Sequence, residues 1–572
     1  MIDVFENDTP LDRYLAQQTD LTAVGRFVRL ERHDLIPTQQ RYYRDLIPLT
    51  KPQPGQQYAF AVDLDSCTGC KSCVTACRSL NGLDDDEAWR TVGLLHHSAT
   101  AAPAVAQQHV TTGCHHCVDP ACLNGCPVDA YEKDPITGIV AHLDDQCIGC
   151  GYCTLTCPYE VPRYNAKRGI VRKCDMCAGR LAEGEAPACV QACPSEAISI
   201  TIVDQATVVA GAVRSRLLPG APHSHITSPT TQYRTTRPGV RAMQPADLLA
   251  LRPAEAHPPL AVMLVLTQLS VGAFIVDFAL QRFVPATVER ALQPWNAGVA
   301  LLLGLVALAA SVLHLGRPRY AFRVVIGFRH SWLSREAVAF GAFAGTAALY
   351  ATALWWSVLG LRHWSVALGA AVGVTGLTAV YCSAKIYVST KRVWWAWRFT
   401  GPKFVLTALM CGLSTVLVTS LAVSVFVGGT LRSATASSIG QPLCLMVVGA
   451  TTVKLLSEAV FLRRGLSHHG ASMGAIITTG TTDMSAQDLH RTARLLTGAL
   501  QRVTLWRFGA GLVGGVALPL WAWLLQTGPS PQVTLAVAVG LISLVTLSAG
   551  ELVERYQFFR AVSVPRMPGP PA

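Results

Sequence analysis

Eight apolar segments fill the second half of the chain. Each is about 20 to 25 residues long, the length that a helix needs to cross a bilayer, and most carry no charge near the middle. A soluble helical core does not require eight such runs, so the pattern predicts an all-α bundle of eight membrane-spanning helices. The expected spans are residues 260–281, 295–315, 337–359, 364–388, 403–427, 440–462, 504–525 and 532–553.

Two polar stretches set the expected domain boundaries. Residues 1–57 are polar and carry no metal-ligand spacing, so they form an N-terminal extension for which docking onto a partner subunit is one option. Residues 204–259 are rich in Thr, Ser, Pro and Arg and lack sustained periodicity, which predicts a linker or belt. The cysteine-rich domain is then expected at 58–203, the membrane domain at 260–560 and a C-terminal tail at 561–572.

Basic residues collect in every second loop of the predicted membrane domain. The loops after the second, fourth and sixth spans contain Arg317, Arg319, Arg323, Arg329, Arg335, Lys391, Arg392, Arg398, Arg463, Arg464, Arg491, Arg494 and Arg502. The other loops contain only Arg282, Arg290, Arg362 and Arg432. Positively charged loops face the cytoplasm, so both termini and the cysteine-rich domain are expected on the cytoplasmic side of the inner membrane. No cleavable or twin-arginine signal is visible, although a partner carrying an export signal would reverse this side.

Composition agrees with a multi-pass membrane protein. Hydrophobic residues make up 51% of the 572 residues and charged residues only 15%, against about 25% charged in a typical soluble domain. These values exclude a disordered chain and argue against a wholly soluble one. The net charge of +11 is largely explained by the basic loops, so it indicates membrane topology and not nucleic-acid binding.

Sixteen of the nineteen cysteines lie in four groups of four. The groups are Cys67, Cys70, Cys73 and Cys77; Cys114, Cys117, Cys122 and Cys126; Cys147, Cys150, Cys153 and Cys157; and Cys174, Cys177, Cys189 and Cys193. The first and third groups have the C-x2-C-x2-C-x3-C spacing of bacterial ferredoxins, in which the fourth cysteine ligates a neighbouring cluster. The remaining three cysteines, Cys382, Cys411 and Cys444, stand alone in apolar segments and are interpreted as core residues.

Zinc and disulfides are the alternatives to iron–sulfur clusters. Zinc sites use pairs of C-x2-C separated by a longer loop, and the triplet spacing here suits a cubane better. Disulfides would require an exported chain. Because the spacing recurs, we expect sixteen ligands for four [4Fe–4S] clusters.

The cysteine-rich region resembles the four-cluster ferredoxin subunit of the molybdopterin oxidoreductase family, which includes dimethyl sulfoxide, polysulfide and nitrate reductases. The matching segments are AVDLDSCTGCKSCVTACRSLNGL, CHHCVDPACLNGCPVDA, CIGCGYCTLTCPYEVPRYN and KCDMCAGRLAEGEAPACVQACPSEAI. The resemblance implies an α+β ferredoxin-like fold in which pairs of groups exchange their last cysteines. The implied ligand sets are Cys67, Cys70, Cys73 and Cys193; Cys174, Cys177, Cys189 and Cys77; Cys114, Cys117, Cys122 and Cys157; and Cys147, Cys150, Cys153 and Cys126. The last cluster would lie nearest the membrane, and it keeps Cys150 where nitrate reductases have a tryptophan and lose one iron.

A quinol is the expected electron donor. A membrane cytochrome b needs histidines within its spans, and none of the histidines from the end of the linker onward is central in one: His257, His314, His330, His363, His468, His469 and His490. The sequence therefore does not favour a haem, and electrons would pass directly between a lipid-soluble quinol and the clusters. His314 ends the second span and Glu336 begins the third, so both would lie at the same depth, where quinol oxidation needs proton acceptors. Arg335 is expected to pair with Glu336 or to contact the quinol, while interfacial anchoring is the alternative role for all three residues.

The membrane domain resembles the eight-helix anchor subunit of dimethyl sulfoxide reductases over residues 258–560. The shared motifs are HLGRP, the SRE that follows Trp332 and Leu333, SAKIYVSTKRVWW and GELVERYQFF. In that family the histidine of HLG and the glutamate of SRE are associated with menaquinol, and they match His314 and Glu336. The chain would then fuse two subunits that are usually separate.

Several polar residues lie within or at the edges of the predicted spans: Lys385, Tyr387, Arg392, Lys454, Glu458 and Glu551. Such groups are functional candidates, although pairing between helices is the expected role for most of them. Lys454 and Glu458 stand one turn apart and are expected to neutralise each other if they do not belong to an ion path.

The sequence as a whole predicts a non-catalytic electron-transfer and membrane-anchor subunit. Menaquinol would be oxidised near His314 and Glu336, and electrons would pass through the clusters to a separate molybdopterin subunit that reduces an acceptor such as dimethyl sulfoxide. The alternatives are reverse flow from a dehydrogenase into quinone, an ion-translocating energy converter, and a purely structural anchor. The direction of flow depends on midpoint potentials, which the sequence does not show.

Overall fold

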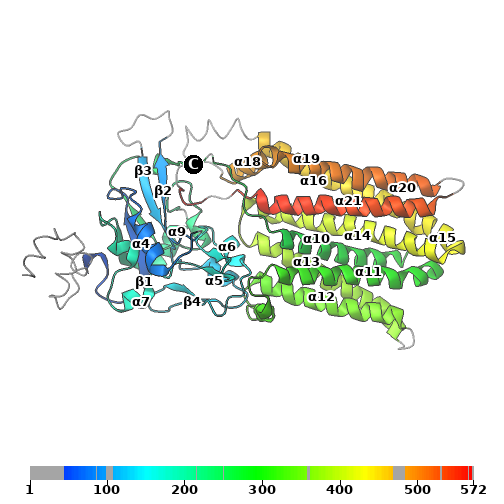
Figure 1. Cartoon of the computed structure of the whole chain (residues 1–572), viewed down its shortest axis with the longest axis horizontal. Helices are drawn as coiled ribbons and strands as arrows, with labels where there is room; N and C mark the ends of the chain where they lie inside the picture. The colour runs from blue at the N-terminus through cyan, green and yellow to red at the C-terminus, as the bar shows by residue number, and fades with distance from the viewer. Residues whose placement is uncertain are drawn as a thin grey trace, which may run out of the picture.

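Two regions of different secondary structure follow one another along the chain and lie end to end (Figure 1). The first is an α+β region with small sheets, and the second is a bundle of long helices. The computed structural model describes residues 44–85, 87–97, 107–213, 215–248, 250–356, 361–467, 484–527, 531–563 and 566–569. His468, His469 and residues 1–43 of the expected extension lie outside the described residues.

An apolar strand forms the centre of the first region. β1 (Gln56–Asp63) is buried along nearly its whole length and lies between β8 (Ile198–Asp204) and β9 (Gln232–Arg234). It runs antiparallel to β8, with Gln56 opposite Asp204, and parallel to β9. A second sheet has the order β10 (Gln244–Pro245), β2 (Thr91–His96), β3 (Gln107–Thr112). Because β9 and β10 come from the segment after residue 204, part of the expected linker completes the sheets of this domain.

Short helices and hairpins carry the cysteine loops. The hairpins are β4 (Tyr131–Lys133) with β5 (Val140–His142), and β6 (Arg163–Asn165) with β7 (Ile170–Arg172). The helices are α4 (Ser72–Asn81), α5 (Ala121–Gly125), α6 (Tyr152–Thr156), α7 (Ala178–Ala182), α8 (Ala188–Gln191) and α9 (Gln205–Ala212). In Figure 1, α5 and α6 face the helical bundle, whereas α4 and α7 lie further from it. The first four helices and α8 hold cysteines within or directly before them, so the local fold groups the thiols around tight turns.

Eight helical segments are long and apolar enough to cross a membrane within the described ranges, as predicted. The uninterrupted spans are α10 (Pro258–Leu280), α11 (Ala286–Leu313), α12 (Trp332–Trp355), α13 (Ser365–Val388), α14 (Trp397–Val427) and α21 (Val533–Arg560). Two further spans contain one wide turn each. The sixth joins α15 (Gly429–Thr435) to α16 (Gln441–Ser467), and the seventh joins α19 (Gln501–Leu512) to α20 (Leu518–Thr527). A separate helix, α18 (Met484–Thr497), precedes the seventh span and lies beside the first region in Figure 1.

Helices α10 and α14 form the centre of the bundle. Their apolar windows are 72% and 67% buried, against 28–39% for the other six spans. Gly272 and Gly412 allow the two backbones to meet, because a Cβ atom on Gly272 would overlap the carbonyl of Ala408. Small residues drive such close contacts between helices in lipid, where the hydrophobic effect does not.

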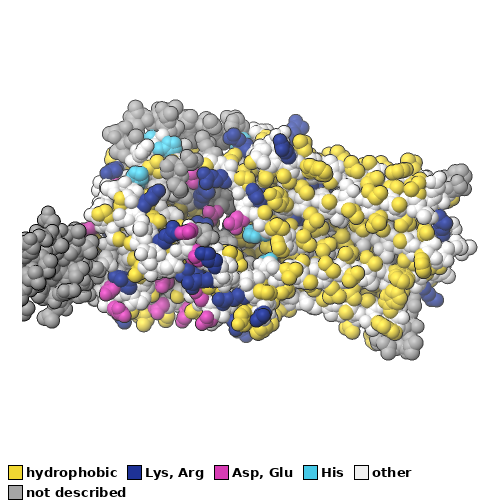
Figure 2. Space-filling model, in the orientation of Figure 1, with side chains coloured by type: hydrophobic (Ala, Val, Ile, Leu, Met, Phe, Trp, Pro, Cys, Tyr) yellow, Lys and Arg dark blue, Asp and Glu magenta, His cyan; other side chains and the backbone are white. Residues whose placement is uncertain are grey.

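The outer surface matches a membrane environment. Hydrophobic side chains cover the visible face of the helical bundle, and Lys and Arg side chains gather where the bundle meets the first region (Figure 2). Exposed apolar residues such as Leu302, Val374 and Leu541 lie on this surface. The chain is therefore a multi-pass membrane protein whose cysteine-rich region sits at one end of the spans.

Candidate functional site

The two cysteine groups furthest from the membrane exchange partners across the fold. Burial raises the pKa of the Cys67 thiol, and the neighbouring thiolates of Cys73, Cys193 and Cys70 raise it further. Burial likewise raises the pKa of Cys77 to about 12, with contributions from Cys189 and Cys177. A thiolate changes the pKa of another thiol only when the two lie close together. Cys193 therefore lies with the first group and Cys77 with the fourth.

The other two groups are crossed in the same way. Burial raises the pKa of Cys117, and the thiolates of Cys114, Cys157 and Cys122 add to this effect. For Cys153, burial is again the main cause of a raised pKa, followed by Cys150 and then by Cys126 and Cys147. Each of the four sets thus takes one member from a distant part of the chain, because the paired loops approach each other from opposite sides.

The surroundings of the thiols suit a negatively charged cluster. Backbone N–H groups donate to sulfur, with Ala130 N to Cys126 Sγ at 3.2 Å and Gly149 N to Cys147 Sγ at 3.4 Å. The buried ammonium of Lys173 lies 3.8 Å from Cys114 Sγ. Burial alone would lower the pKa of Arg90, but the thiolates of Cys189 and Cys73 raise it above its usual range. Such donors and cations stabilise iron–sulfur clusters, so the residues present fit this group.

The described thiol sets do not match the geometry of a site for a single metal ion. Among the described residues, no three His, Cys, Asp or Glu side chains converge closely enough to hold one metal ion. A cubane is larger than one ion and needs four cysteines that stand further apart than the ligands of a single ion. All cysteines are free thiols, including the isolated Cys382, Cys411 and Cys444, which are buried in the bundle.

The four sets form a row that ends at the membrane. Cys73 of the first set neighbours Cys189 of the second, and Cys174 of the second neighbours Cys114 of the third. Tyr131 connects the third set to the last: burial raises its pKa, and Cys153 and Cys122 raise it further. Each set therefore lies beside the next one along the cysteine-rich region.

The loop of the last set contacts the loop between α11 and α12 directly. Gly316 N donates to Gly149 O at 3.2 Å and Arg317 N donates to Ile148 O at 3.0 Å. Leu315 and Cys150 both pack against the apolar cluster that contains Cys147 and Cys153. On the other side, Tyr152 extends into the bundle and its hydroxyl donates to Ile386 O at 2.9 Å.

We expect Gly316→Ala to destabilise this interdomain contact. A Cβ atom at Gly316 would overlap the Gly169 carbonyl and lie 2.7 Å from the Tyr164 hydroxyl. Overpacking of this kind costs about 1 to 3 kcal/mol. The Tm of the full chain in mild detergent measures the effect, and Gly341→Ala is the control because its Cβ would meet no atom within 4 Å. Equal Tm values for the two variants would show that the contact tolerates a wider spacing.

The three residues predicted for quinol chemistry do not form one cluster. His314 caps the end of α11, and burial lowers its pKa. Glu336 lies in the first turns of α12, is 4% exposed, and its Oε1 has no hydrogen-bond partner among the described residues. Tyr152 lies near it, because burial raises the pKa of Tyr152 and the Glu336 carboxylate raises it further. Glu336 therefore lies near Tyr152 of the last cysteine loop, and His314 lies two residues before Gly316, which contacts the same loop.

The predicted pairing of Arg335 with Glu336 is wrong. Arg335 donates to the carbonyls of Phe328 and Arg329, at 3.1 and 2.5 Å, and lies over the Trp332 ring. Successive helix residues point about 100° apart, so Arg335 reaches the surface while Glu336 faces the interior.

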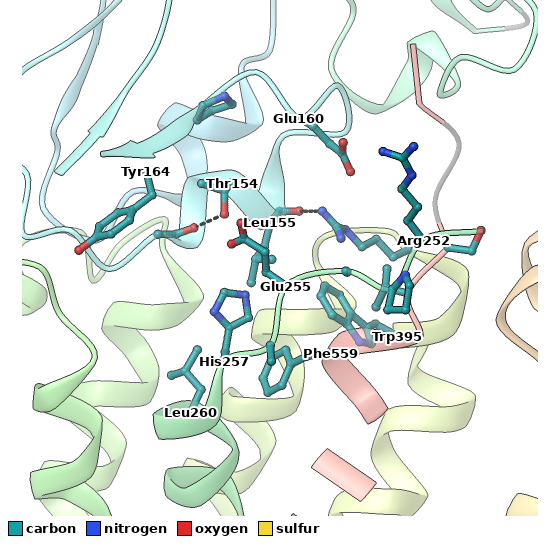
Figure 3. Close-up of a pocket in the computed structure, with 18 of the residues that line it drawn as sticks. Thr154, Leu155, Glu160, Tyr164, Arg252, Glu255, His257, Leu260, Trp395 and Phe559 are labelled. Carbon is teal, nitrogen blue, oxygen red and sulfur yellow. Dashed lines mark hydrogen bonds between the residues drawn. The ribbon is translucent and has the colours of Figure 1, made fainter. Parts of the chain in front are cut away.

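A cavity of about 780 Å³ lies between the cysteine-rich region and the bundle (Figure 3). On the side of the cysteine-rich region, the cavity wall includes Cys150 and the neighbouring Gly149 and Gly151. His314 faces the cavity from the end of α11. Its membrane side includes His257, Leu260, Trp395 and Phe559. Arg392, from the loop before α14, donates to Leu155 O at 3.0 Å across the same space.

Sequence reasoning missed most of this cavity. Glu336 and Arg335 are not among the described residues that line it, whereas His257, Trp395 and Phe559 are. These three come from the starts or ends of different spans, and no local motif connects them. The signal that was available is the aromatic content of SAKIYVSTKRVWW and GELVERYQFF at the edges of their spans.

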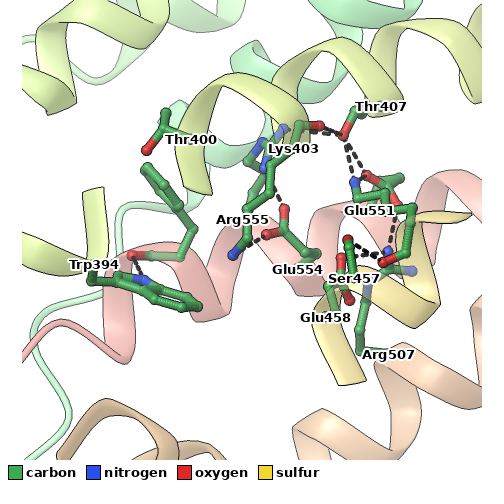
Figure 4. A network of polar contacts seen from close by, with 12 residues as sticks. Trp394, Thr400, Lys403, Thr407, Ser457, Glu458, Arg507, Glu551, Glu554 and Arg555 are labelled. Carbon is green, nitrogen blue, oxygen red and sulfur yellow. Dashed lines mark hydrogen bonds and ion pairs between the residues drawn. The ribbon is translucent and has the colours of Figure 1, made fainter. Parts of the chain in front are cut away.

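A second polar cluster lies inside the bundle (Figure 4). Lys454 and Thr407 both bond to the Glu551 carboxylate. The Arg507 guanidinium bridges two carboxylates: it lies 2.9 Å from that of Glu551 and 3.1 Å from that of Glu458. The expected mutual neutralisation of Lys454 and Glu458 is therefore wrong, since each pairs with a different helix.

The same network continues toward α14. Lys403 pairs with Glu554 at 3.1 Å and lies 3.8 Å from the centre of the Trp394 ring. Arg555 also pairs with Glu554 and donates to Gln268 at 2.8 Å. Helices α10, α14, α16, α19 and α21 are thus tied together by buried charges, which confirms pairing between helices as the role of Lys454, Glu458 and Glu551.

Comparison with known proteins agrees with both halves of the structure. The 4Fe-4S dicluster domain family matches residues 105–203, and the DMSO reductase anchor subunit (DmsC) family matches residues 255–560. The probable anaerobic dimethyl sulfoxide reductase chain YnfG of Escherichia coli is 35% identical over 185 residues, which cover 30% of this chain and 86% of that protein.

Other relatives share the cysteine-rich region. A subunit of the anaerobic dimethyl sulfoxide reductase of Haemophilus influenzae is 36% identical over 157 residues, 26% of this chain and 76% of that protein. The formate dehydrogenase-O iron-sulfur subunit of Escherichia coli is 35% identical over 158 residues, 25% of this chain and 52% of that protein.

The fold and the cysteine sets define a membrane-anchored iron–sulfur electron-transfer protein. The chain belongs to the DMSO reductase anchor subunit (DmsC) family, whose match covers more than half of it. The predicted union of a ferredoxin-like subunit and an anchor subunit in one chain is confirmed. Membership in an anchor family implies a membrane-anchored partnership with a catalytic subunit.

Proposed function

We propose that this chain oxidises menaquinol or a related quinol and passes the electrons to a separate molybdopterin subunit that reduces an acceptor such as dimethyl sulfoxide. The observation that carries the proposal is the cavity that has His314 and the Cys150 loop in the same wall. A quinol in this cavity would contact a proton acceptor and lie beside the first electron acceptor at once. The Trp395 and Phe559 rings offer flat apolar surfaces for its ring system.

Four [4Fe–4S] clusters would be held by the crossed cysteine sets. The sets are Cys67, Cys70, Cys73 and Cys193; Cys77, Cys174, Cys177 and Cys189; Cys114, Cys117, Cys122 and Cys157; and Cys126, Cys147, Cys150 and Cys153. When bound, such clusters supply one-electron carriers, which a two-electron quinol requires. The cation of Lys173 and the N–H groups of Ala130 and Gly149 would stabilise their negative charge.

The protons of the quinol need acceptors in this chain. His314 faces the cavity, and burial keeps its imidazole neutral and able to accept a proton by lowering its pKa. Glu336 is a buried carboxyl group near Tyr152, where it would support the departure of a proton through the bundle. Intramembrane carboxyl groups with unpartnered oxygens are functional candidates by default.

The catalytic subunit would dock at the end of the row that is furthest from the membrane. Cys70 is exposed there, so the first cluster would lie close to the protein surface. Exposure at this end and burial at the membrane end favour electron transfer in one line through the domain. The even-numbered loops lie on the same side as this domain, and their positive charge supports a cytoplasmic side of the inner membrane.

Reverse flow into quinone is the second candidate. The observation that favours it is the likeness of the cysteine-rich region to a formate dehydrogenase iron-sulfur subunit. Potentiometric titration of the purified complex separates the two directions. Cluster potentials above that of the quinone pool support quinol oxidation, whereas potentials well below it support quinone reduction.

We expect His314→Gln and Glu336→Gln each to slow the reduction of the clusters by a quinol about 100-fold or more, because the first removes a proton acceptor and the second removes the carboxyl group that would support proton departure. The full chain in nanodiscs is mixed with a short-chain naphthoquinol, and bleaching of the cluster absorbance gives the rate. Glu289→Gln, at the opposite end of α11, is the matched control. Iron content and reduction by dithionite should not change in any variant. Wild-type rates in both variants would reject this site.

A further inference from the structure

The imidazole of His257 faces the quinol cavity and has no other evident task. His257 directly precedes α10, and its side chain makes no capping hydrogen bond to the helix. Its ring packs edge-on against Phe559, with centroids 5.3 Å apart. Among the hydrogen bonds of the described residues, none involves its ring nitrogens, and Figure 3 shows the ring pointing from the membrane side into the cavity beside Glu255.

His257 and His314 lie close enough to influence each other. Burial lowers the pKa of His314, the Ser311 backbone raises it in part, and a charge on His257 lowers it. Burial also lowers the pKa of His257, which Glu255 raises and Arg392 lowers. Two imidazoles thus face one cavity, and each disfavours a positive charge on the other. If both imidazoles were protonated, their positive charges would repel each other. At least one of the two protons therefore needs a path out of the cavity.

The chemistry of the proposed reaction requires two acceptors. Oxidation of one quinol breaks two O–H bonds, and the ring leaves as quinone after two electrons pass singly to the iron–sulfur clusters. His314 accounts for one of the two protons. Glu336 does not line the cavity, and the arginines that do are cations that cannot accept a proton: Arg163, Arg252, Arg392, Arg491 and Arg566. Of the two carboxylates there, Glu160 lies on the side away from the membrane helices and Glu255 lies in the connecting segment. The neutral imidazole of His257 therefore remains as the second acceptor on the membrane side of the cavity.

Glu255 offers the exit for this proton. It stands two residues before His257 in the connecting segment and lines the same cavity, and its carboxylate acts on the His257 imidazole. Glu160 and Arg252 follow further along the wall, on the side away from the membrane helices (Figure 3). A proton on His257 can therefore pass to Glu255 and on to solvent without crossing the apolar bundle.

We infer that His257 is the second proton acceptor of the quinol site, opposite His314, and that Glu255 relays its proton to solvent. This inference rests on the proposed quinol oxidation. In each turnover one hydroxyl proton goes to a His314 nitrogen and the other to a His257 nitrogen, while both electrons go to the clusters.

The test uses the full chain with its clusters in nanodiscs and a short-chain naphthoquinol as the reductant. His257→Gln and His257→Phe should each slow cluster reduction about tenfold or more, because one acceptor is lost. His257→Phe keeps the ring contact with Phe559, so it separates packing from proton transfer. His257→Ala should regain part of the lost rate when imidazole is added to the buffer. The matched control is His363→Gln, an exposed histidine just before α13.

A non-reducing quinone analogue separates the outcomes, with binding followed by quenching of tryptophan fluorescence. The inference is supported if the analogue binds within about threefold of wild type while the rate falls and imidazole restores it. It is overturned if the His257 variants keep the wild-type rate while His314→Gln is slow, or if rate and binding fall together without rescue. If the wild-type chain neither binds the analogue nor accepts electrons from quinol, the proposed function itself fails.

Discussion

Cys150→Ser is expected to abolish the reduction of the clusters by quinol while dithionite still reduces the rest of the row. Cys150 is the one cysteine of the last set that lines the cavity, next to Gly149 and Gly151. Losing this thiolate removes a ligand from the cluster nearest the membrane, so electrons from the cavity have no first acceptor. If that cluster is lost entirely, iron content should fall from about 16 to about 12 atoms per chain.

Electron paramagnetic resonance and iron analysis on the same sample check this expectation. The control is Cys444→Ser, because Cys444 is buried in α16 far from the cysteine sets and belongs to none of them. That variant should keep the full iron content and the wild-type rate of reduction by quinol. A Cys150→Ser protein with an unchanged spectrum and full quinol activity would contradict both the ligand set and the entry point.

Lys454→Met is expected to cause the largest loss of stability among single changes in the bundle. Lys454 and Glu551 are both completely buried, and the substitution leaves Glu551 with only part of its compensation. Removing one partner of a buried ion pair costs about 3 to 5 kcal/mol, because the remaining charge stays in an apolar environment. Arg507, at 2.9 Å from Glu551, still pairs with this carboxylate and so limits the loss of stability. Its charge is shared, however, because it also pairs with Glu458.

The Tm in mild detergent measures this effect. The double variant Lys454→Met with Glu551→Gln should recover much of the loss, since it leaves no unpaired carboxylate and keeps the Arg507 pair with Glu458. Arg432 is half-buried and makes a solvent-exposed hydrogen bond to Thr534 near the opposite end of the bundle, so Arg432→Gln should change stability by no more than about 0.5 kcal/mol. Equal Tm values for wild type and Lys454→Met would show that the network does not hold the helices together.

This network also bears on an ion-translocating role. Glu551 pairs with Lys454 and Arg507 from two other helices, and Glu554 pairs with Lys403 from α14 and with its own neighbour Arg555. A path for ions needs acidic groups without a fixed cation, whereas each of these carboxylates is held by two cations. The geometry therefore favours a structural role for these charges.

The spans and the cysteine motifs could be predicted because they depend on local order. A helix in lipid must satisfy its own backbone hydrogen bonds, so length and hydropathy alone identify it. The predicted ends were less accurate: α11 begins at Ala286, nine residues before the expected start at 295, because its first turns are polar and still helical. The wide turns at Ala436–Gly440 and Val513–Ala517 left no comparable pattern in the sequence.

Partners across the fold could not be predicted in the same way. Lys454 and Glu458 are spaced so that they could pair along one helix. Instead, Lys454 pairs with Glu551 of α21, and Glu458 pairs with Arg507 of α19. Arg335 and Glu336 are adjacent in sequence but point in different directions, since one helix residue rotates by about 100° relative to the next.

By itself, the sequence determined that this protein has eight spans, that sixteen cysteines have cluster spacing, and that the two features occupy separate halves of the chain. Only the tertiary structure decided that the Cys150 loop meets the loop of Gly316, and that His257, His314, Trp395 and Phe559 surround one cavity. The physical reason is that spacing along a chain fixes which residues share a helix or a turn. Which faces of these elements meet depends on packing between segments that lie hundreds of residues apart.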